Sequence, residues 1–100
     1  RGKIWIDEGA VKALTTGKKS LLPAGVRKTD GQYTRHDIIE VLAPDGAPIA
    51  RGMTNYSSDE VAAIMGRKTT EIEKVLGARD YDEVIHRDNL VVLDDPRHPS

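Results

Sequence analysis

The stretch GKKSLLPAGV, Gly17 to Val26, decides how this chain is expected to fold. Its apolar residues favour an extended conformation, but Pro23 cannot donate a hydrogen bond to a neighbouring strand, and Gly25 permits a bulge or a close backbone approach. The run SLLPAGVRKT, residues 20–29, therefore predicts an irregular or edge strand. Irregular sheet edges often lie beside functional sites.

The residues before this stretch predict a strand followed by a helix. KIWID, residues 3–7, is typical of a short strand. Asp7 is expected to cap a helix through EGAVKALTTG, residues 8–17, in which Val11 and Leu14 share a face. Gly17 offers a left-handed end to that helix.

The residues after it predict a turn and then a hairpin. Residues 29–31, Thr-Asp-Gly, indicate a turn, and DIIEVLA, residues 37–43, a buried strand. Pro-Asp-Gly at 44–46 is a hairpin turn signal, and PIARGMT, residues 48–54, is the expected return strand.

Two short helices are expected next. Ser57 and Glu60 form a capping box, and Gly66 ends the first helix. Residues 70–73 repeat the cap, and Gly77 repeats the stop. The apolar stripes of the two helices are Val61, Ile64 and Met65 in the first and Ile72, Val75 and Leu76 in the second.

The last part of the domain predicts one or two closing strands, VIH and NLVVL, separated by a turn at Asp88 and Asn89. Residues 94–100 are expected to form a flexible tail after a domain of residues 1–93. Strands at both ends suggest that the termini pair. The expected fold is α+β, mainly β: a mixed-sheet pseudo-barrel with two to three short helices.

Composition indicates one globular domain. The 100 residues are 38% hydrophobic and 31% charged, without cysteine. No apolar run approaches the roughly 20 residues of a membrane helix, so we expect no membrane partner and a cytoplasmic location. The chain begins at Arg1 directly in a strand-like run, which suggests a piece of a longer protein.

The net charge of −1 conceals an asymmetry. Residues 1–36 hold eight Lys or Arg and three acids, and residues 37–100 hold seven against thirteen. The basic third could form a face for nucleic acid. We favour the alternative, in which the rest of the fold or an acidic neighbouring domain neutralises this charge.

Catalytic and metal motifs are not supported by the sequence. His86-Arg87-Asp88 matches the start of a protein-kinase catalytic loop, but the metal-binding Asn expected five residues later is Leu93. A Gly-rich phosphate loop is also missing. The histidines at 36, 86 and 98 lack metal-ligand spacing, so we expect no metal site.

Four blocks carry a resemblance to a known family. GKKSLLPAGV resembles the signature of PUA domains, which are small pseudo-barrels. Together with ARGMTNYSSDEV at 50–61, GRKTTEIEKVLG at 66–77 and DEVIHRDNLVVL at 82–93, it closely resembles the C-terminal PUA domain of the bacterial glutamate 5-kinase family. The resemblance extends from Gly2 to about Leu93.

The resemblance implies a parent enzyme that phosphorylates L-glutamate with ATP in proline biosynthesis. In that family an N-terminal amino-acid-kinase domain holds ATP and magnesium, so no catalytic residue and no cofactor is expected in this chain. Its expected role is accessory, in assembly or regulation of the parent. The expected partner is that kinase domain, within an enzyme that is expected to be a homo-oligomer.

The alternative is RNA binding, which the resemblance places on the first helix, the loop after it, the following strand and part of the last strand. A free-standing accessory PUA domain for RNA modification is a further alternative. Lys and Arg side chains on this RNA-facing surface would neutralise phosphates, although the chain has only four aromatic residues for base stacking. The candidate RNA-binding residues are Lys12, Lys18, Lys19, Ser20, Gly25 and Arg27.

Overall fold

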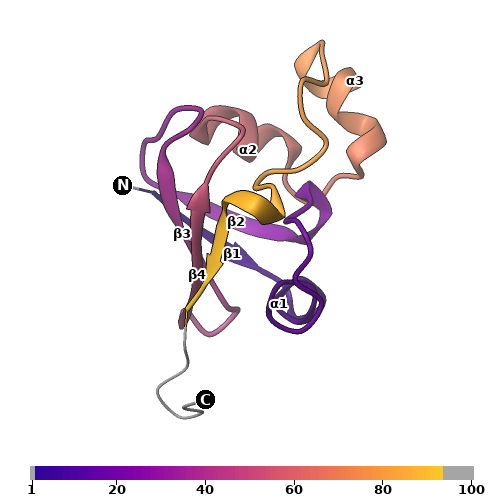
Figure 1. The fold of residues 1–100 in the computed structure, drawn as a ribbon. Coiled ribbons are helices and arrows are strands. Elements are labelled where there is room, and N and C mark those ends of the chain that lie inside the picture. The colour runs from indigo at the N-terminus through magenta and orange to yellow at the C-terminus, as the bar shows by residue number, and fades with distance from the viewer. Residues whose placement is uncertain (1, 94–100) are drawn as a thin grey trace.

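The computed structural model describes residues 2–93, so the predicted tail at 94–100 lies outside the described residues. The chain forms the strands and helices labelled in Figure 1. The strands are β1 (Gly2–Ile6), β2 (Val26–Asp30), β3 (Ile38–Leu42), β4 (Pro48–Met53) and β5 (Leu90–Val92). The helices are α1 (Glu8–Thr15), α2 (Ser58–Ile64) and α3 (Ile72–Leu76).

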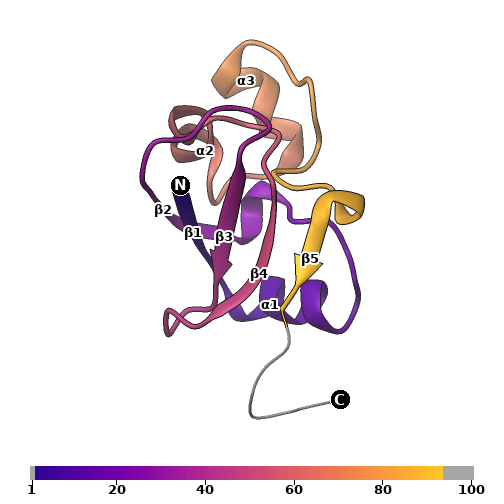
Figure 2. The same cartoon turned by 60° about the vertical axis from the view of Figure 1, so that its left-hand side comes forward.

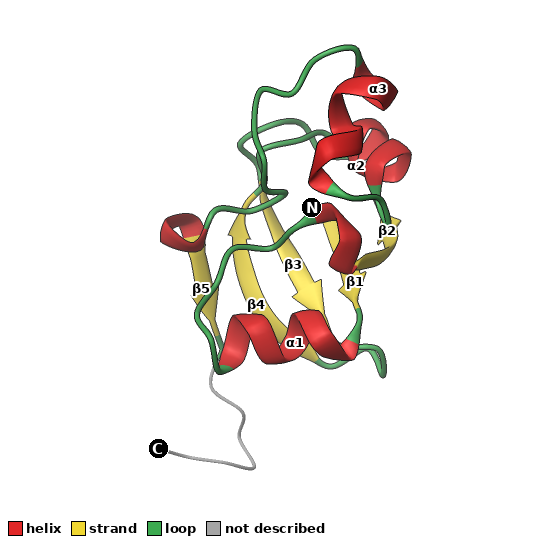
Figure 3. Cartoon of the chain, turned by 90° about the vertical axis from the view of Figure 1, so that its right-hand side faces the viewer, coloured by secondary structure: helices red, strands yellow, loops and turns green. Residues whose placement is uncertain are grey.

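The five strands form one mixed sheet in the order β2-β1-β3-β4-β5. β1 is parallel to β3, and the other neighbours are antiparallel. Figure 3 shows α1 crossing one face of the sheet, with α2 and α3 stacked at one end of the strands. The face against which α1 packs is called the inner face.

The expectation that the terminal strands pair and close the barrel is wrong for the described residues. β1 already has a hydrogen-bonded neighbour on each edge, β2 and β3, so it has no edge left for β5. β5 pairs instead with the outer edge of β4. An isolated bridge between Leu21 and Ile85 brings the two ends of the sheet towards each other without closing it.

The core lies on the inner face because strand residues alternate between faces. Ile4 and Ile6 of β1 are fully buried, as is Val41 of β3. Leu14 of α1 and Ile64 of α2 complete the same cluster from the helices. The predicted mainly-β class is confirmed, with three helices over an open sheet.

Several local predictions are confirmed. The Ala10 amide donates to Asp7 Oδ1 at 2.7 Å, which caps α1. Ser57 and Glu60 form the predicted capping box of α2. The hairpin is also as predicted, with β3 and β4 antiparallel on either side of the turn at 44–46.

Other local predictions are wrong. The left-handed residue after α1 is Lys18, with φ 51°, and not Gly17, because the Gly17 amide still donates to Lys12 O at 3.2 Å. The second cap is also shifted: the Lys68 amide donates to Glu71 Oε1 at 2.9 Å, since a 3₁₀ turn at Thr69–Glu71 precedes α3. Gly77, with φ 84°, ends α3 as predicted.

The strand predicted at 20–29 starts later than expected. Pro23–Gly25 forms a 3₁₀ turn, and β2 begins at Val26. The prediction of an irregular edge strand is nevertheless confirmed, because β2 is the first strand of the sheet order and its register with β1 shifts between Trp5 and Ile6.

A polar and aromatic cluster ties three distant segments together. The Arg35 guanidinium donates two hydrogen bonds to Glu60, at 2.9 and 2.7 Å, and one to Asp80 at 2.9 Å. The same group lies 5.2 Å from the ring centre of Tyr56. Tyr56 packs edge-on against Tyr81, with ring centres 5.8 Å apart. This cluster joins the loop before β3, helix α2 and the segment after α3.

Replacing Tyr56 with Phe is expected to destabilise the domain by about 1–3 kcal/mol. The fully buried Tyr56 hydroxyl donates to Tyr81 O and accepts from Tyr81 N at 3.0 Å, so its removal leaves both backbone groups without this partner. Urea unfolding of the chain measures the change. Tyr81→Phe is the control, because the Tyr81 hydroxyl forms a long, exposed hydrogen bond with His36 Nε2 at 3.4 Å. Equal stability of Tyr56→Phe and wild type would contradict the assignment.

Glu60→Gln is expected to remove an acid-sensitive part of the stability. The hydrogen bonds from Arg35 lower the pKa of Glu60 from 4.5 to about 2. A lowered folded-state pKa stabilises the protein above about pH 4.5, and this contribution is lost as the pH falls towards 2. After discounting for solvent screening, the loss at neutral pH is on the order of 1–2 kcal/mol.

The measurement is urea unfolding of wild type and variant between pH 7 and pH 2. The two stability curves should converge at the acid end, because the wild-type carboxylate is protonated there. The exposed Glu73→Gln serves as the charge-matched control. A constant difference between Glu60→Gln and wild type at every pH would contradict the proton linkage.

Candidate functional site

The structure does not gather the six predicted RNA-binding residues around one cavity. Lys19, Ser20 and Gly25 line a first cavity beside α1. Lys18 and Lys19 line a second cavity nearer β5. Arg27 lines a third cleft, where β1 ends and β2 begins. Lys12 lines none of these three cavities.

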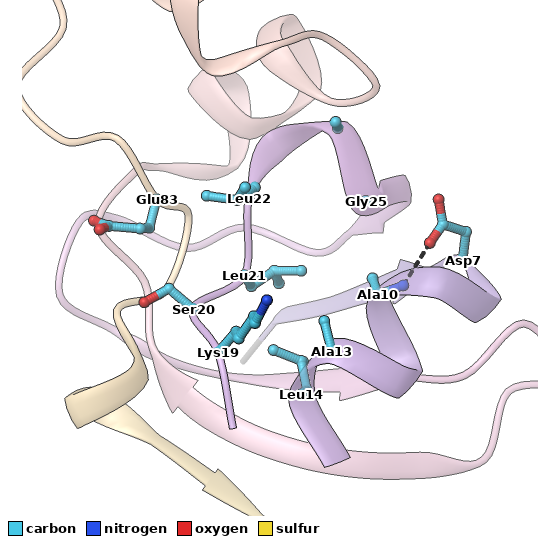
Figure 4. Close-up of a pocket in the computed structure, with 11 residues that line it drawn as sticks. Asp7, Ala10, Ala13, Leu14, Lys19, Ser20, Leu21, Leu22, Gly25 and Glu83 are labelled. Carbon is cyan, nitrogen blue, oxygen red and sulfur yellow. Dashed lines mark hydrogen bonds between the residues drawn. The ribbon is translucent and has the colours of Figure 1, made fainter. Parts of the chain in front are cut away.

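The first cavity has an apolar floor and a polar rim. Its volume is about 370 Å³, and Figure 4 shows α1 contributing Ala10, Ala13 and Leu14 to its wall. Leu21 and Leu22 face them from the loop that follows. The rim carries both signs of charge, with Lys19 between Asp7 at one end and Glu83 at the other. The negative charges of the two carboxylates would repel a ligand with many phosphates.

Gly25 is explained by helix packing. A Cβ at this position would lie 2.7 Å from the Cβ of Ala10, and the Asp7 amide donates to Gly25 O at 3.0 Å. The 3₁₀ turn therefore touches the first turn of α1 directly. The space that the missing side chain leaves is filled by Ala10, so Gly25 does not require a ligand to account for it.

Ser20 fixes the loop after α1 to the segment before β5. Its hydroxyl oxygen accepts from the Arg87 amide at 2.8 Å. Beside it, the Leu21 amide donates to Ile85 O at 2.9 Å, and the Val84 amide donates to Leu21 O at 2.7 Å. These bonds hold two segments of the chain together that lie more than sixty residues apart.

The same contacts bring Lys18, Lys19 and Arg87 together, and we call the cavity that they line the basic groove. These three side chains line the second cavity, of about 240 Å³, together with Leu14, Leu90 and Val92. Arg87 was missed by the sequence-based choice of residues. The resemblance placed part of the last strand on the RNA-facing surface, which was the signal for it, but no residue was assigned there.

Arg27 lies in a different environment. Its cleft, of about 520 Å³, is shared with Trp5, Lys28 and the acidic pair Asp7 and Glu8. The Lys28 ammonium lies 4.6 Å from the centre of the Trp5 ring. That cation covers the ring and the carboxylates lie nearby, so the cleft is neither a stacking platform nor a purely basic surface.

The other side chains of residues 2–93 show no sign of a metal centre. No three His, Cys, Asp or Glu residues in that range gather where they could hold a metal ion. No helix in the same range is long and apolar enough to cross a membrane. The groups that this surface offers are cations, carboxylates and a hydroxyl, which suit binding.

Solved structures share this fold. A PUA domain from Aeropyrum pernix K1, in complex with tartrate, superposes with a TM-score of 0.67 and 23% identity over 96% of this chain and 45% of that one. An H/ACA RNP bound to a substrate RNA gives a TM-score of 0.61 and 20% identity over 98% of this chain and 26% of that one. At these identities the likeness concerns the fold.

Sequence relatives are considerably closer. A glutamate 5-kinase from Caldanaerobacter subterraneus is 57% identical over 93 residues, which are 93% of this chain and 25% of that protein. One from Thermosynechococcus vestitus is 47% identical over 92 residues, again 25% of its length. The chain thus spans about a quarter of these relatives.

The family model of the PUA domain matches residues 2–76. This range includes the inner-face core strands, α1 and its loop, the hairpin and both later helices. The chain therefore belongs to the PUA domain family, and within it matches the PUA domain of glutamate 5-kinases.

Proposed function

We propose that this chain is the accessory domain of a bacterial glutamate 5-kinase that acts in the cytoplasm. The observation that carries the proposal is the 57% identity over 93% of the chain, which corresponds to one quarter of the relative. It favours a kinase parent over a free-standing RNA-modification accessory protein. The parent would transfer the γ-phosphate of ATP to the side-chain carboxylate of L-glutamate, the first step towards proline.

Catalysis in this proposal belongs to an N-terminal amino-acid-kinase domain outside this chain. That domain would bind glutamate, ATP and magnesium, and it would be the first partner of this chain. The present domain contributes through protein contacts that shape the assembly or regulation of a homo-oligomeric enzyme. The hydrogen bond to Ser20 and the ion pairs of Arg35 hold loops from distant parts of the chain together. They give the domain the defined surface that such contacts require.

Removal of residues 1–93 from the full enzyme tests this role. We expect glutamate phosphorylation to persist, because the catalytic groups lie outside the deleted part, while the oligomeric state or the response to effectors changes. Steady-state kinetics and sedimentation velocity measure the two properties. The separate 100-residue chain, assayed with ATP and glutamate, should form no product. A deletion variant with unchanged kinetics, regulation and sedimentation would contradict the proposal.

RNA binding is the second candidate, and the basic groove of Lys18, Lys19 and Arg87 favours it. Stacking on unpaired bases is not available to the buried rings of Tyr33 and Tyr56. An RNA ligand would therefore be recognised through its backbone phosphates and its shape, as at the end of a duplex.

The RNA alternative predicts that Lys18→Glu combined with Lys19→Glu abolishes binding at physiological salt. Each lost phosphate contact should weaken binding for all sequences and lower the salt slope by about 1. Fluorescence anisotropy with total tRNA measures the effect at two salt concentrations. The charge-matched control is Lys68→Glu with Lys74→Glu, two exposed lysines near α3. Equal losses from both double variants, or binding at low salt only, would contradict specific RNA recognition.

A further inference from the structure

The face of the sheet opposite α1 has no helix of the described chain over β3 and β4. In Figure 2 these two strands lie in front and α1 lies behind them. We call this the outer sheet face. By the alternation of side chains along each strand it includes Lys28 and Asp30 on β2, Lys3 and Trp5 on β1, Ile38, Glu40 and Leu42 on β3, Arg51 and Met53 on β4, and Val91 on β5, with Leu93 just beyond it. The Lys28 ammonium lies over the Trp5 ring.

A row of alternating charges runs across this face. Lys3 is in register with Asp30 on one side and with Glu40 on the other. Glu40 is in turn opposite Arg51, which is opposite Val91. Two cations and two anions therefore follow one another in alternating order, and the row is neutral. A polyanion such as RNA gains no net attraction from it, in contrast to the basic groove on the inner side.

Exposed apolar side chains border the charged row. Val91 is 66% exposed and Ile38 is 52% exposed. Ile38 is in register with Met53, so the two flank the row on neighbouring strands. A hollow of about 300 Å³ lies among these residues, lined by Ile38, Arg51, Gly52, Asn89, Val91 and Leu93. Apolar groups gathered in a hollow with a polar border are typical of a protein contact surface.

The position of the N-terminal end of β1 indicates what covers this surface. β1 and β3 are parallel, with Gly2 in register with Ile39, so both strands start at the same end of the sheet (Figure 2). Ile38 is the residue before Ile39. In the proposed enzyme the kinase domain precedes β1, so its chain arrives beside the exposed Ile38 and the half-buried Met53. The relatives, which are about four times as long, supply enough protein to cover the face.

We propose that the outer sheet face docks against the kinase domain of the parent enzyme, with Ile38 and Val91 inserted into an apolar surface and Glu40 and Arg51 facing polar groups around it. This inference rests on the proposed function and adds the surface through which it acts. The basic groove near α1 remains free of that contact.

The lack of cysteine in this chain allows a direct test in the full enzyme. Ile38→Cys and Val91→Cys introduce thiols on the outer sheet face. Leu22→Cys is the matched control, because Leu22 is a 47% exposed apolar residue that lines the first cavity on the inner side. Peptide mass spectrometry follows the labelling of each thiol by a maleimide.

Docking predicts that the two outer-face thiols of the native enzyme are labelled at least about tenfold more slowly than the Leu22→Cys thiol, because a packed interface excludes the reagent. The three rates should converge in urea. Equal rates in a native enzyme that still phosphorylates glutamate would overturn the docking surface and leave the proposed function standing. Failure of the wild-type enzyme to phosphorylate glutamate would instead overturn the proposed function.

The identity of the covering partner has its own readout. A photoreactive diazirine amino acid at position 91 of the full enzyme should cross-link to peptides of the kinase domain. Cross-links only to residues 1–93 of a second copy, or none at all, would overturn the assignment of the partner.

Discussion

The pairing of β1 on both of its edges is the constraint on which the rest of this fold depends. β1 is parallel to β3 and antiparallel to β2, so the chain between Ile6 and Ile38 places β2 on one edge of β1 and then crosses to its other edge. The connection from β1 to β2 contains α1, which covers the inner face, and β2 becomes an edge strand. β5 pairs with β4 and leaves the outer edge of β2 unpaired, so the sheet remains open.

This arrangement gives the two faces of the sheet different chemistry. On the inner side, the loop held by Ser20 carries Lys18 and Lys19 towards Arg87, which concentrates positive charge beside an apolar cavity. On the outer side, charges of opposite sign alternate across the strands and apolar groups remain exposed. A single small sheet thus separates a surface suited to anions from a surface suited to another protein domain.

Local signals predicted most of the elements, because caps and tight turns depend on neighbours in the sequence. Asp7, the Ser57 box and the turn at 44–46 all lie where the sequence placed them. Lys18 replaced Gly17 as the left-handed residue because helix hydrogen bonding continued one residue further. Sheet closure and the contribution of Arg87 could not be predicted, since both depend on contacts between segments far apart in the chain.

The position of the sole tryptophan has a spectroscopic consequence. Trp5 lies on β1 with the Lys28 ammonium of β2 against its ring, so its emission is sensitive to the pairing of these two strands. Two of the three tyrosines, Tyr56 and Tyr81, lie in a different region, where Arg35 holds α2 to the segment after α3, and the third, Tyr33, bonds to Thr29 of β2. Tryptophan emission therefore reports on the sheet, and most of the tyrosine absorbance reports on the helical end. Their melting curves coincide only when the sheet and the helical end unfold as one unit.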